Sequence, residues 1–518
     1  MPLKKIALKS GFNKQATASQ AEGEWIDGDN VRFRYGSPEK IGGWEQITDK
    51  LLVGAARAQW MWTDLTGRRY SALGTNKCLY VYDGDAIYDI TPLDATRALT
   101  SCTYTSITGS ATVTINKSSH GLLVGELFKF TSATTPGSPT TGYTAASFTT
   151  NTFEVKTTPT INTFTITMAT AETGTGVTAG GTLAISPYYF IGPITSTLAY
   201  GWGAGTWSLS TWGTPRTVSN TDIAAANWSL DNFGELLIAT IKNGSTFKWA
   251  PTAGTGVSTR ASLVPTNPTA SVMTIVSDRD RHLLHLGTET LIGTPATQDP
   301  MFIRFSDQED IEEYDPTSTN TAGTFRLDDG TTIVGAVRAK DYILVLTDTA
   351  AYSIQFVGSP YTFSIRKVGS NCGCIGQHAM VFVNGAVWWM GDSGGFFIYD
   401  GTVKDVESLV EDFVFTTKGT DNLGINYSAG DIVYAGLNTL FTEINWFYPK
   451  AGSTQVDRVT TINYAENTWT TGSLARTTWE NSKVFKFPYA TEYDATATPT
   501  APTINGVSVG ASYYFIQD

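Results

Sequence analysis

The chain has 518 residues, which is more than one ordinary hydrophobic core holds, so we expect more than one domain. Its 50 glycines, 12% aromatic content and only 16% charged content are typical of a β-rich protein with many turns and little helix. The net charge of −12 argues against a protein that grips nucleic acid through its phosphates. No apolar run approaches the ~18 residues of a membrane span, so we expect no membrane insertion.

Residues 1–50 are expected to form an extended N-terminal segment and the first strands. In Val31–Tyr35, apolar residues alternate with two arginines, which predicts a strand with one apolar and one basic face. Pro38 and Gly42-Gly43 then interrupt this pattern.

Residues 51–100 have the pattern expected for the first blade of a β-propeller. The stretch LYVYDGDAIYDI consists of an apolar strand, a turn at Asp83-Gly84 and a return strand, and Val381–Val403 contains a similar plan, FFIYDGTV. Comparable hairpins recur roughly every 45 to 60 residues, which is close to the length of propeller blades. The predicted fold is therefore all-β, a propeller of six to seven degenerate blades. A pair of β-sandwiches is the alternative.

Residues 101–187 interrupt this rhythm with a stretch that is rich in Thr and Ser and nearly free of charge. Val113 and Ile115 alternate with Thr, as do Phe164 and Ile166, and period-two alternation is what a half-buried sheet needs. We expect a small β-barrel or sandwich inserted after the first blade, with a long surface loop as the alternative.

The remaining blades are expected in residues 188–480, where Gly and Trp alternate around Trp202 and Trp207. Residues 481–518 are expected to form a C-terminal linker and a strand, ASYYFIQ. Because a chain rarely stops in an unpaired strand, we expect that this end is truncated.

Two motifs suggest chemistry that their surroundings do not support. Gly391–Gly395 reads GDSGG, as in trypsin-like proteases, but the chain has only four histidines, none in the matching context, and these residues also suit a tight turn. His282 and His285 are three apart, so in a strand they point to opposite faces and cannot share one ion. We therefore expect no catalytic residue, no metal site and no cofactor.

The sharpest charge run places six carboxylates in nine residues. Its members are Asp307, Glu309, Asp310, Glu312, Glu313 and Asp315. They lack the spacing of a calcium loop, and the plainest interpretation is a solvated loop between strands. Carboxylates that line the channel of a ring, or an interface, are a further interpretation, because they would repel DNA phosphates and let a duplex slide past.

Three segments, taken in order, resemble the tail nozzle (tail tubular or hub) proteins of short-tailed bacteriophages. They are WIDGDNVRFRYGSPEKIGGW at Trp25–Trp44, PMFIRFSDQEDIEEYDPTSTNTAGTFRLDDG at Pro300–Gly330, and WWMGDSGGFFIYDG. The resemblance implies a β-propeller with added domains, assembled as a ring of six copies at the distal end of the tail. It implies a structural virion protein that is made in the host cytoplasm and is not an enzyme.

The partners implied by this resemblance are other copies of the chain, the tail adaptor, tail fibres or a plug, and genomic DNA that passes without sequence-specific binding. Two alternatives stay open. A propeller glycoside hydrolase would place acids from several blades at the channel mouth, whereas here the acids cluster in one loop. A carbohydrate-binding adhesin would expose aromatic residues, for which Trp202, Trp207 and Trp212 are the candidates.

Overall fold

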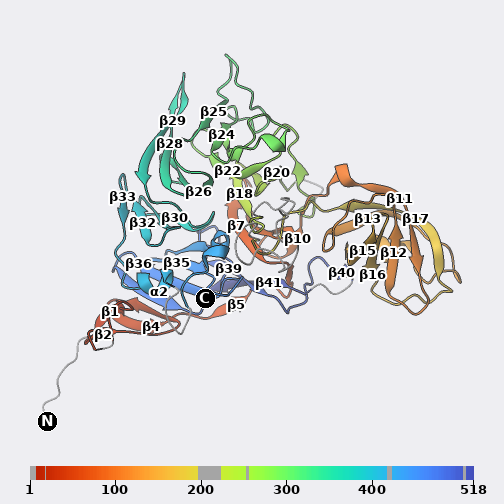
Figure 1. Cartoon of the computed structure of the whole chain (residues 1–518), viewed down its shortest axis with the longest axis horizontal. Helices are drawn as coiled ribbons and strands as arrows, with labels where there is room; N and C mark the ends of the chain where they lie inside the picture. Colours follow the sequence, from red (N-terminus) through yellow and green to blue (C-terminus); the bar gives the residue numbers. More distant parts are fainter. Residues whose placement is uncertain are drawn as a thin grey trace, which may run out of the picture.

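The computed structural model describes residues 8–17, 19–196, 223–251, 256–416, 423–505 and 509–517. Within these residues, seven β-sheets are arranged radially as the blades of a propeller, and a further eight-stranded sheet forms a small domain at its side (Figure 1). The predicted all-β propeller with an inserted β domain is thus confirmed, and the number of blades is seven.

The first strand of each blade lies at the centre of the disc, where it contacts the first strands of both neighbouring blades. These inner strands are β7 (Ala56–Thr63), β18 (Trp228–Phe233), β22 (Ser271–Ser277), β26 (Ile333–Arg338), β30 (Met380–Val383), β34 (Tyr434–Asn438) and β38 (Thr478–Glu480). The contacts run through this series and return from β38 to β7, so the ring is closed. Each inner strand pairs on one side only, which leaves its other edge toward the axis.

Three further strands follow in sequence order and pair outward, antiparallel, in each of the first six blades. They are β8 (Arg69–Thr75), β9 (Leu79–Tyr82) and β10 (Ile87–Asp89) in blade 1; β19 (Leu236–Ile241), β20 (Thr246–Trp249) and β21 (Ser262–Leu263) in blade 2; β23 (His282–Thr288), β24 (Phe302–Phe305) and β25 (Gly323–Arg326) in blade 3; β27 (Ile343–Thr347), β28 (Ala350–Gly358) and β29 (Thr362–Ser370) in blade 4; β31 (Ala386–Met390), β32 (Phe396–Tyr399) and β33 (Val403–Asp405) in blade 5; and β35 (Glu443–Tyr448), β36 (Arg458–Asn463) and β37 (Thr468–Gly472) in blade 6. The turn at Asn384-Gly385 has positive φ at both residues, 51° and 84°, as a two-residue hairpin turn requires.

Blade 7 joins the two ends of the chain. Its strands are β38, β39 (Tyr489–Asp494), β41 (Ala511–Gln517) and β5 (Trp44–Gln46), and β6 (Leu52–Val53) also pairs with β41. Residues 481–518, expected to be a linker and a strand, therefore supply two strands of this blade, and β41 is paired on both sides. The N-terminal strand β5 thus completes the sheet of the last blade and joins the two ends of the chain.

The remaining N-terminal strands cover the side of blade 6. They are β1 (Lys9–Phe12), β2 (Glu24–Trp25), β3 (Val31–Arg34) and β4 (Ser37–Lys40). The Arg32 guanidinium donates two hydrogen bonds to the Glu443 carboxylate, at 3.0 and 3.1 Å, and lies 3.5 Å from the ring centre of Phe441. Both charged side chains are buried, so the predicted basic face of this strand is an anchor to blade 6.

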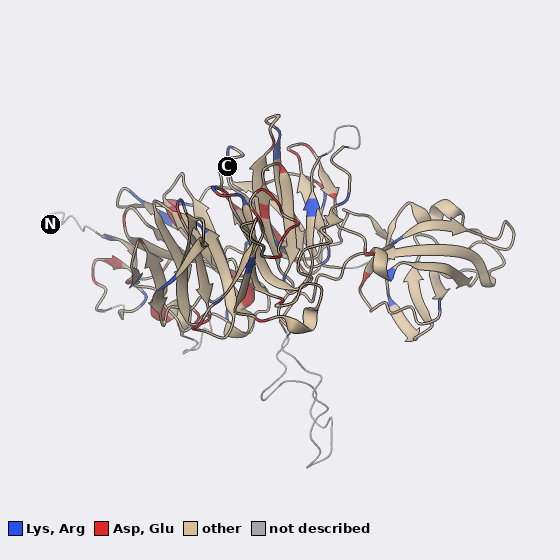
Figure 2. Ribbon diagram, turned by 90° about the horizontal axis from the view of Figure 1, so that it is seen from above, with Lys and Arg blue, Asp and Glu red and all other residues tan. Residues whose placement is uncertain are grey.

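The inserted domain follows blade 1 and projects from the propeller (Figure 1). Its sheet contains β11 (Leu99–Ser106), β12 (Thr112–Asn116), β13 (Leu127–Thr134), β14 (Thr152–Glu154), β15 (Thr157–Thr160), β16 (Thr163–Thr167), β17 (Val177–Pro187) and β40 (Ile504–Asn505). The alternating apolar residues named above, such as Val113 and Phe164, are fully buried in its own core. Figure 2 shows few charged residues in this domain.

Helices are short throughout the described residues. They are α1 (Ala145–Thr149) and α2 (Glu411–Phe415), with the 3₁₀ turns η1 (Ala95–Arg97), η2 (Pro295–Thr297) and η3 (Tyr427–Ile432). None of them combines the length and the apolar character that crossing a bilayer requires.

Tryptophan side chains connect neighbouring blades. The Trp228 indole of blade 2 donates to the Thr75 carbonyl of blade 1 at 2.8 Å, and the Trp479 indole of blade 7 donates to the Leu437 carbonyl of blade 6 at 3.0 Å. In both pairs a glycine makes room: a Cβ at Gly74 would lie 2.4 Å from the Trp228 ring. A Cβ at Gly436 would lie 2.5 Å from the Trp479 ring.

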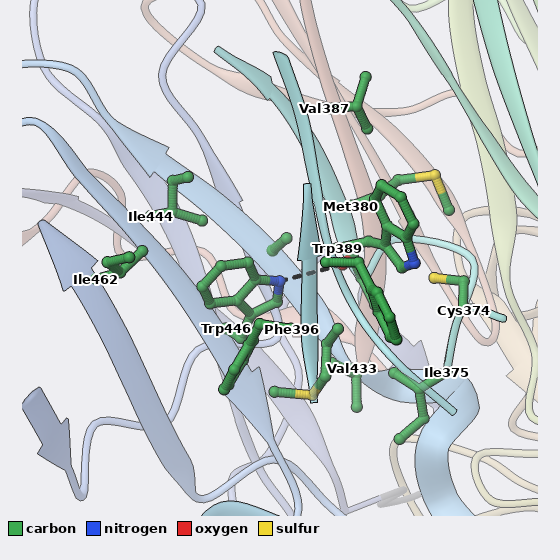
Figure 3. Packing of buried hydrophobic residues seen from close by; sticks show 14 of the residues in the cluster. Cys374, Ile375, Met380, Val387, Trp389, Phe396, Val433, Ile444, Trp446 and Ile462 are labelled. Carbon is green, nitrogen blue, oxygen red and sulfur yellow. Dashed lines mark hydrogen bonds between the residues drawn. The ribbon is translucent and has the colours of Figure 1, made fainter. Parts of the chain in front are cut away.

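Trp446 and Trp389 make the same type of contact in the largest core cluster (Figure 3). Trp446 of blade 6 donates to the Ala379 carbonyl just before blade 5, at 3.1 Å. Trp389 of blade 5 donates to the Cys372 carbonyl just after blade 4, at 3.0 Å. Both indoles are fully buried, so these bonds satisfy their N–H groups as well as positioning the blades.

We expect Gly436→Ala to lower the free energy of unfolding by about 1–3 kcal/mol, because the added methyl group collides with the Trp479 ring. Gly43→Ala is the matched control, since a Cβ there meets no atom within 4 Å and its φ is not positive. Urea unfolding followed by tryptophan fluorescence measures both. Equal midpoints for the two variants would contradict the role given to the glycine.

Candidate functional site: the acidic loop and the axial cavity

The acidic run predicted above lies in the loop between β24 and β25, at the outer side of blade 3. The Asp307 carboxylate accepts hydrogen bonds from the backbone N–H and the hydroxyl of Thr321, at 2.8 and 2.6 Å. These bonds hold the pKa of Asp307 below its usual value, although its partial burial acts in the opposite direction. Asp307 therefore fixes the two ends of the loop to each other.

Two other carboxylates of this loop form ion pairs with neighbouring segments. Glu309 pairs with Arg281 at 2.5 Å and Glu312 with Lys248 of blade 2 at 2.5 Å. Both pairs are well exposed to solvent, so each contributes little to stability but restrains the loop.

The other three carboxylates form no ion pair within 4 Å among the described residues, although the charge of Asp315 acts on the Arg304 guanidinium. The Asp310 carboxylate accepts from the Glu312 backbone N–H, and the Glu313 carboxylate accepts from that of Asp315, so these contacts stay within the loop. Tyr314, by contrast, is buried. The described residues contain no group of three His, Cys, Asp or Glu side chains that could hold a metal ion.

The protease-like motif forms the turn between β31 and β32, and Ser393 is exposed there. All four histidines have other partners: His120 bonds Thr160, His282 bonds Thr321, His285 bonds Ser271, and His378 bonds Asn227. No described histidine therefore hydrogen-bonds Ser393, and the geometry of a serine protease is not assembled here.

A cavity of about 450 Å³ lies at the axis of the propeller, where the inner strands of all seven blades contribute to its wall. Among its lining residues are four aromatic side chains from four blades: Trp60, Phe382, Tyr434 and Trp479. Because side chains from every blade reach it, residues far apart in the sequence could act together in this cavity.

Arg338 forms a charged cluster in this cavity. Its guanidinium donates to Asp231 of blade 2 at 3.3 Å and to Asp278, just after β22 of blade 3, at 2.9 Å. It also donates to the Val276 carbonyl at 3.1 Å. Burial raises the pKa of Asp231, but the Arg338 charge and the Val276 backbone N–H oppose this shift.

Glu480, at the end of β38, is the other carboxylate in the cavity wall. No basic side chain of the described residues forms an ion pair with it. Burial raises the pKa of Glu480 to about 7, and the Ser482 side chain and Asn481 backbone offset this only in part. Near neutral pH this carboxyl therefore exchanges a proton readily.

Two further polar residues border the cavity without charge. Burial lowers the pKa of His378 to about 4, so its ring is neutral, and it bonds the Trp228 carbonyl at 3.0 Å. The Gln377 amide also approaches that carbonyl, at 3.3 Å, but its Oε1 atom is buried and has no hydrogen-bond partner. The cavity thus contains acceptors that the protein itself does not satisfy.

Sequence reasoning placed the acids of interest in one loop and missed those of the axis. Asp231, Asp278 and Glu480 come from three blades and are separated by up to 249 positions, as the numbering shows. Asp231 lies within β18, Asp278 just after β22 and Glu480 at the end of β38, so a position in or beside an inner strand was the only available signal. The sequence shows the cluster of the β24–β25 loop but not the axial acids, because only closure of the disc brings these distant residues together.

No family model matches the chain, and no curated protein matches it. Solved structures resemble it distantly. A putative 6-phosphogluconolactonase from Bacteroides uniformis ATCC 8492 is 12% identical over 52% of this chain and 80% of that one, with a TM-score of 0.33. The phage phi92 endosialidase is 11% identical, with a TM-score of 0.22, over 93% of this chain and 60% of that one.

A computationally designed protein, Ika8, is 8% identical over 91% of this chain and the whole of that one, with a TM-score of 0.34. Likenesses as distant as these three carry no argument about function.

Because the folded protein holds a proton on Glu480 that the unfolded chain releases, stability should fall as pH rises from about 4.5 to about 7. We expect the difference in free energy of unfolding between Glu480→Gln and the wild type to change by about 2 kcal/mol, in favour of the variant, from pH 5 to pH 8. Urea unfolding at both pH values measures this difference. Glu39→Gln on exposed β4 is the control, and a Glu480→Gln effect that is the same at both pH values would contradict the assignment.

Proposed function

We propose that this chain is a structural subunit of the tail nozzle of a short-tailed bacteriophage, one of six copies in a ring that extends the DNA exit channel. Its partners would be the tail adaptor, neighbouring copies, and fibres or a plug, and its location the virion tail. Three resembling segments support this proposal, and they fall in β2–β5, in the β24–β25 hairpin and in β31–β32. The resemblance therefore involves blades 3, 5 and 7 as well as the N-terminal hairpins.

The structural observation that carries the proposal is a closed disc with a lateral arm. The blade faces are packed against each other, and the inserted domain projects sideways with its own core (Figures 1 and 2). Such a shape leaves the rim and the arm for contacts between copies. The arm is restrained at its base, because Lys77 of blade 1 pairs with Glu154 at 2.7 Å.

The DNA path would run between the copies and not through one propeller. A cavity of about 450 Å³ that is lined by aromatic side chains is far too small for a duplex about 20 Å across. Asp310 and Glu313, which form no ion pair among the described residues, would repel phosphates if the β24–β25 loop faces that path.

We expect the purified chain to form closed rings of six copies. Electron microscopy should show a central opening of roughly 20 Å or more, enough for duplex DNA. Mass photometry over a concentration series is the independent measurement. A single copy at every concentration, or a ring with a narrower opening, would contradict the nozzle proposal.

One observation favours a second candidate, a propeller glycoside hydrolase. Acids from blades 2, 3 and 7 gather near the axis, and a general acid with a pKa near 7 is what such enzymes use. Asp231 and Asp278, however, are both engaged by Arg338, so this axial group offers no second free carboxylate of the kind that hydrolysis needs. The tryptophans that favour an adhesin, Trp202, Trp207 and Trp212, lie outside the described residues.

We expect no release of reducing sugar from a panel of bacterial surface glycans, because one unpaired carboxylate cannot serve both steps of hydrolysis. Reducing-end assays at pH 5, 6 and 7 test this, with the Glu480→Gln variant as the background control. Turnover by the wild type that disappears in Glu480→Gln would replace the structural proposal by the enzymatic one.

A further inference from the structure

We propose that the axial cavity is a binding site for a small protonated aliphatic amine, held by the Glu480 carboxylate and the Gln377 amide oxygen between aromatic walls. This site is independent of the ring proposal, since it lies within one propeller.

The cavity wall contains a hydrogen-bond acceptor that no donor of the protein satisfies. The Gln377 Oε1 atom is buried without a partner, although the residue is only 2% exposed. Buried polar atoms in folded proteins almost always have a partner from the protein, from water or from a ligand. The Glu480 carboxylate has hydrogen bonds from Ser482 and the Asn481 backbone but no cationic partner among the described residues, and it adds a second acceptor in the same cavity. A ligand that fits both must donate hydrogen bonds.

The charge of the cavity selects a cation. Its one guanidinium, Arg338, is already shared by Asp231 and Asp278, so it does not neutralise Glu480. His378 is held neutral, because burial lowers its pKa to about 4. An anionic ligand would therefore meet an excess of negative charge, whereas an ammonium group would complete the pairing of Glu480.

The aromatic walls favour an organic cation over a metal ion. Trp60, Phe382, Tyr434 and Trp479 border the cavity, and aromatic faces attract alkylammonium groups. Calcium would need six to eight oxygen ligands, typically several carboxylates. The described residues offer no group of three acidic, His or Cys side chains for it. The cavity volume of about 450 Å³ suits an aliphatic chain with one or two amino groups.

Methionine methyl groups report on binding inside the cavity. Of the seven methionines, Met273 and Met380 line the wall. The full chain labelled with ¹³C at its methionine methyl groups is titrated at pH 8 with 1,4-diaminobutane, and separately with 1,4-butanediol as the neutral probe of the same shape. We expect saturable shifts of the Met273 and Met380 signals with the diamine and none with the diol.

Variants then test the assigned acceptors. Glu480→Gln should weaken diamine binding about tenfold or more, because it removes the charge that pairs with the ammonium group. Glu39→Gln, on the exposed strand β4, should leave binding unchanged. Equal shifts with diol and diamine, shifts confined to other methionines, or undiminished binding by Glu480→Gln would each overturn the proposal. The comparison of the two probes on the wild type holds even if the variant does not fold.

Discussion

The contact on which the disc depends is a tryptophan of one blade seated against the backbone of the blade before it. Trp228, Trp389, Trp446 and Trp479 each donate their indole N–H to a carbonyl in the preceding blade or its connection. The ring supplies the area that packs two radial sheets, and the N–H fixes its orientation. A glycine opposite the ring, as at Gly74 and Gly436, sets the distance between the blades.

Closure follows from this packing, but it requires the chain ends. Blade 7 combines β38, β39 and β41 with β5 from the N-terminal region, so the sheet of the last blade is complete only when both ends are in place. The bonds of Arg32 to buried Glu443 hold the preceding hairpin on blade 6. Closure in turn brings Asp231, Arg338 and Glu480 to one cavity, which no local segment could assemble.

The sequence predicted well what depends on neighbouring residues. Asp83-Gly84 identified its hairpin because glycine readily adopts the positive φ of a tight turn, and Gly84 has a φ of 96°. The alternation at Val113 and Ile115 identified a half-buried sheet where composition suggested a loop. The pairing of β5 with β41 could not be predicted, because it joins residues more than 460 positions apart and no turn signals it. The axial acids were missed for the same reason.

The carboxylates of the β24–β25 loop and those at the axis differ in what stabilises their negative charge, and this difference bears on function. In the β24–β25 loop, water and the partners of Glu309 and Glu312 stabilise the charges, so the loop can stay anionic at little cost. At the axis, burial raises the pKa of Asp231 and the Arg338 charge opposes this shift, whereas Glu480 has no cationic partner among the described residues and its pKa is about 7. A surface that repels a polyanion such as DNA needs exposed carboxylates that stay ionised, like those of the β24–β25 loop. A carboxyl that has no cationic partner among the described residues and lies in an aromatic cavity is instead poised to exchange its proton for a cation, so the axis is suited to binding.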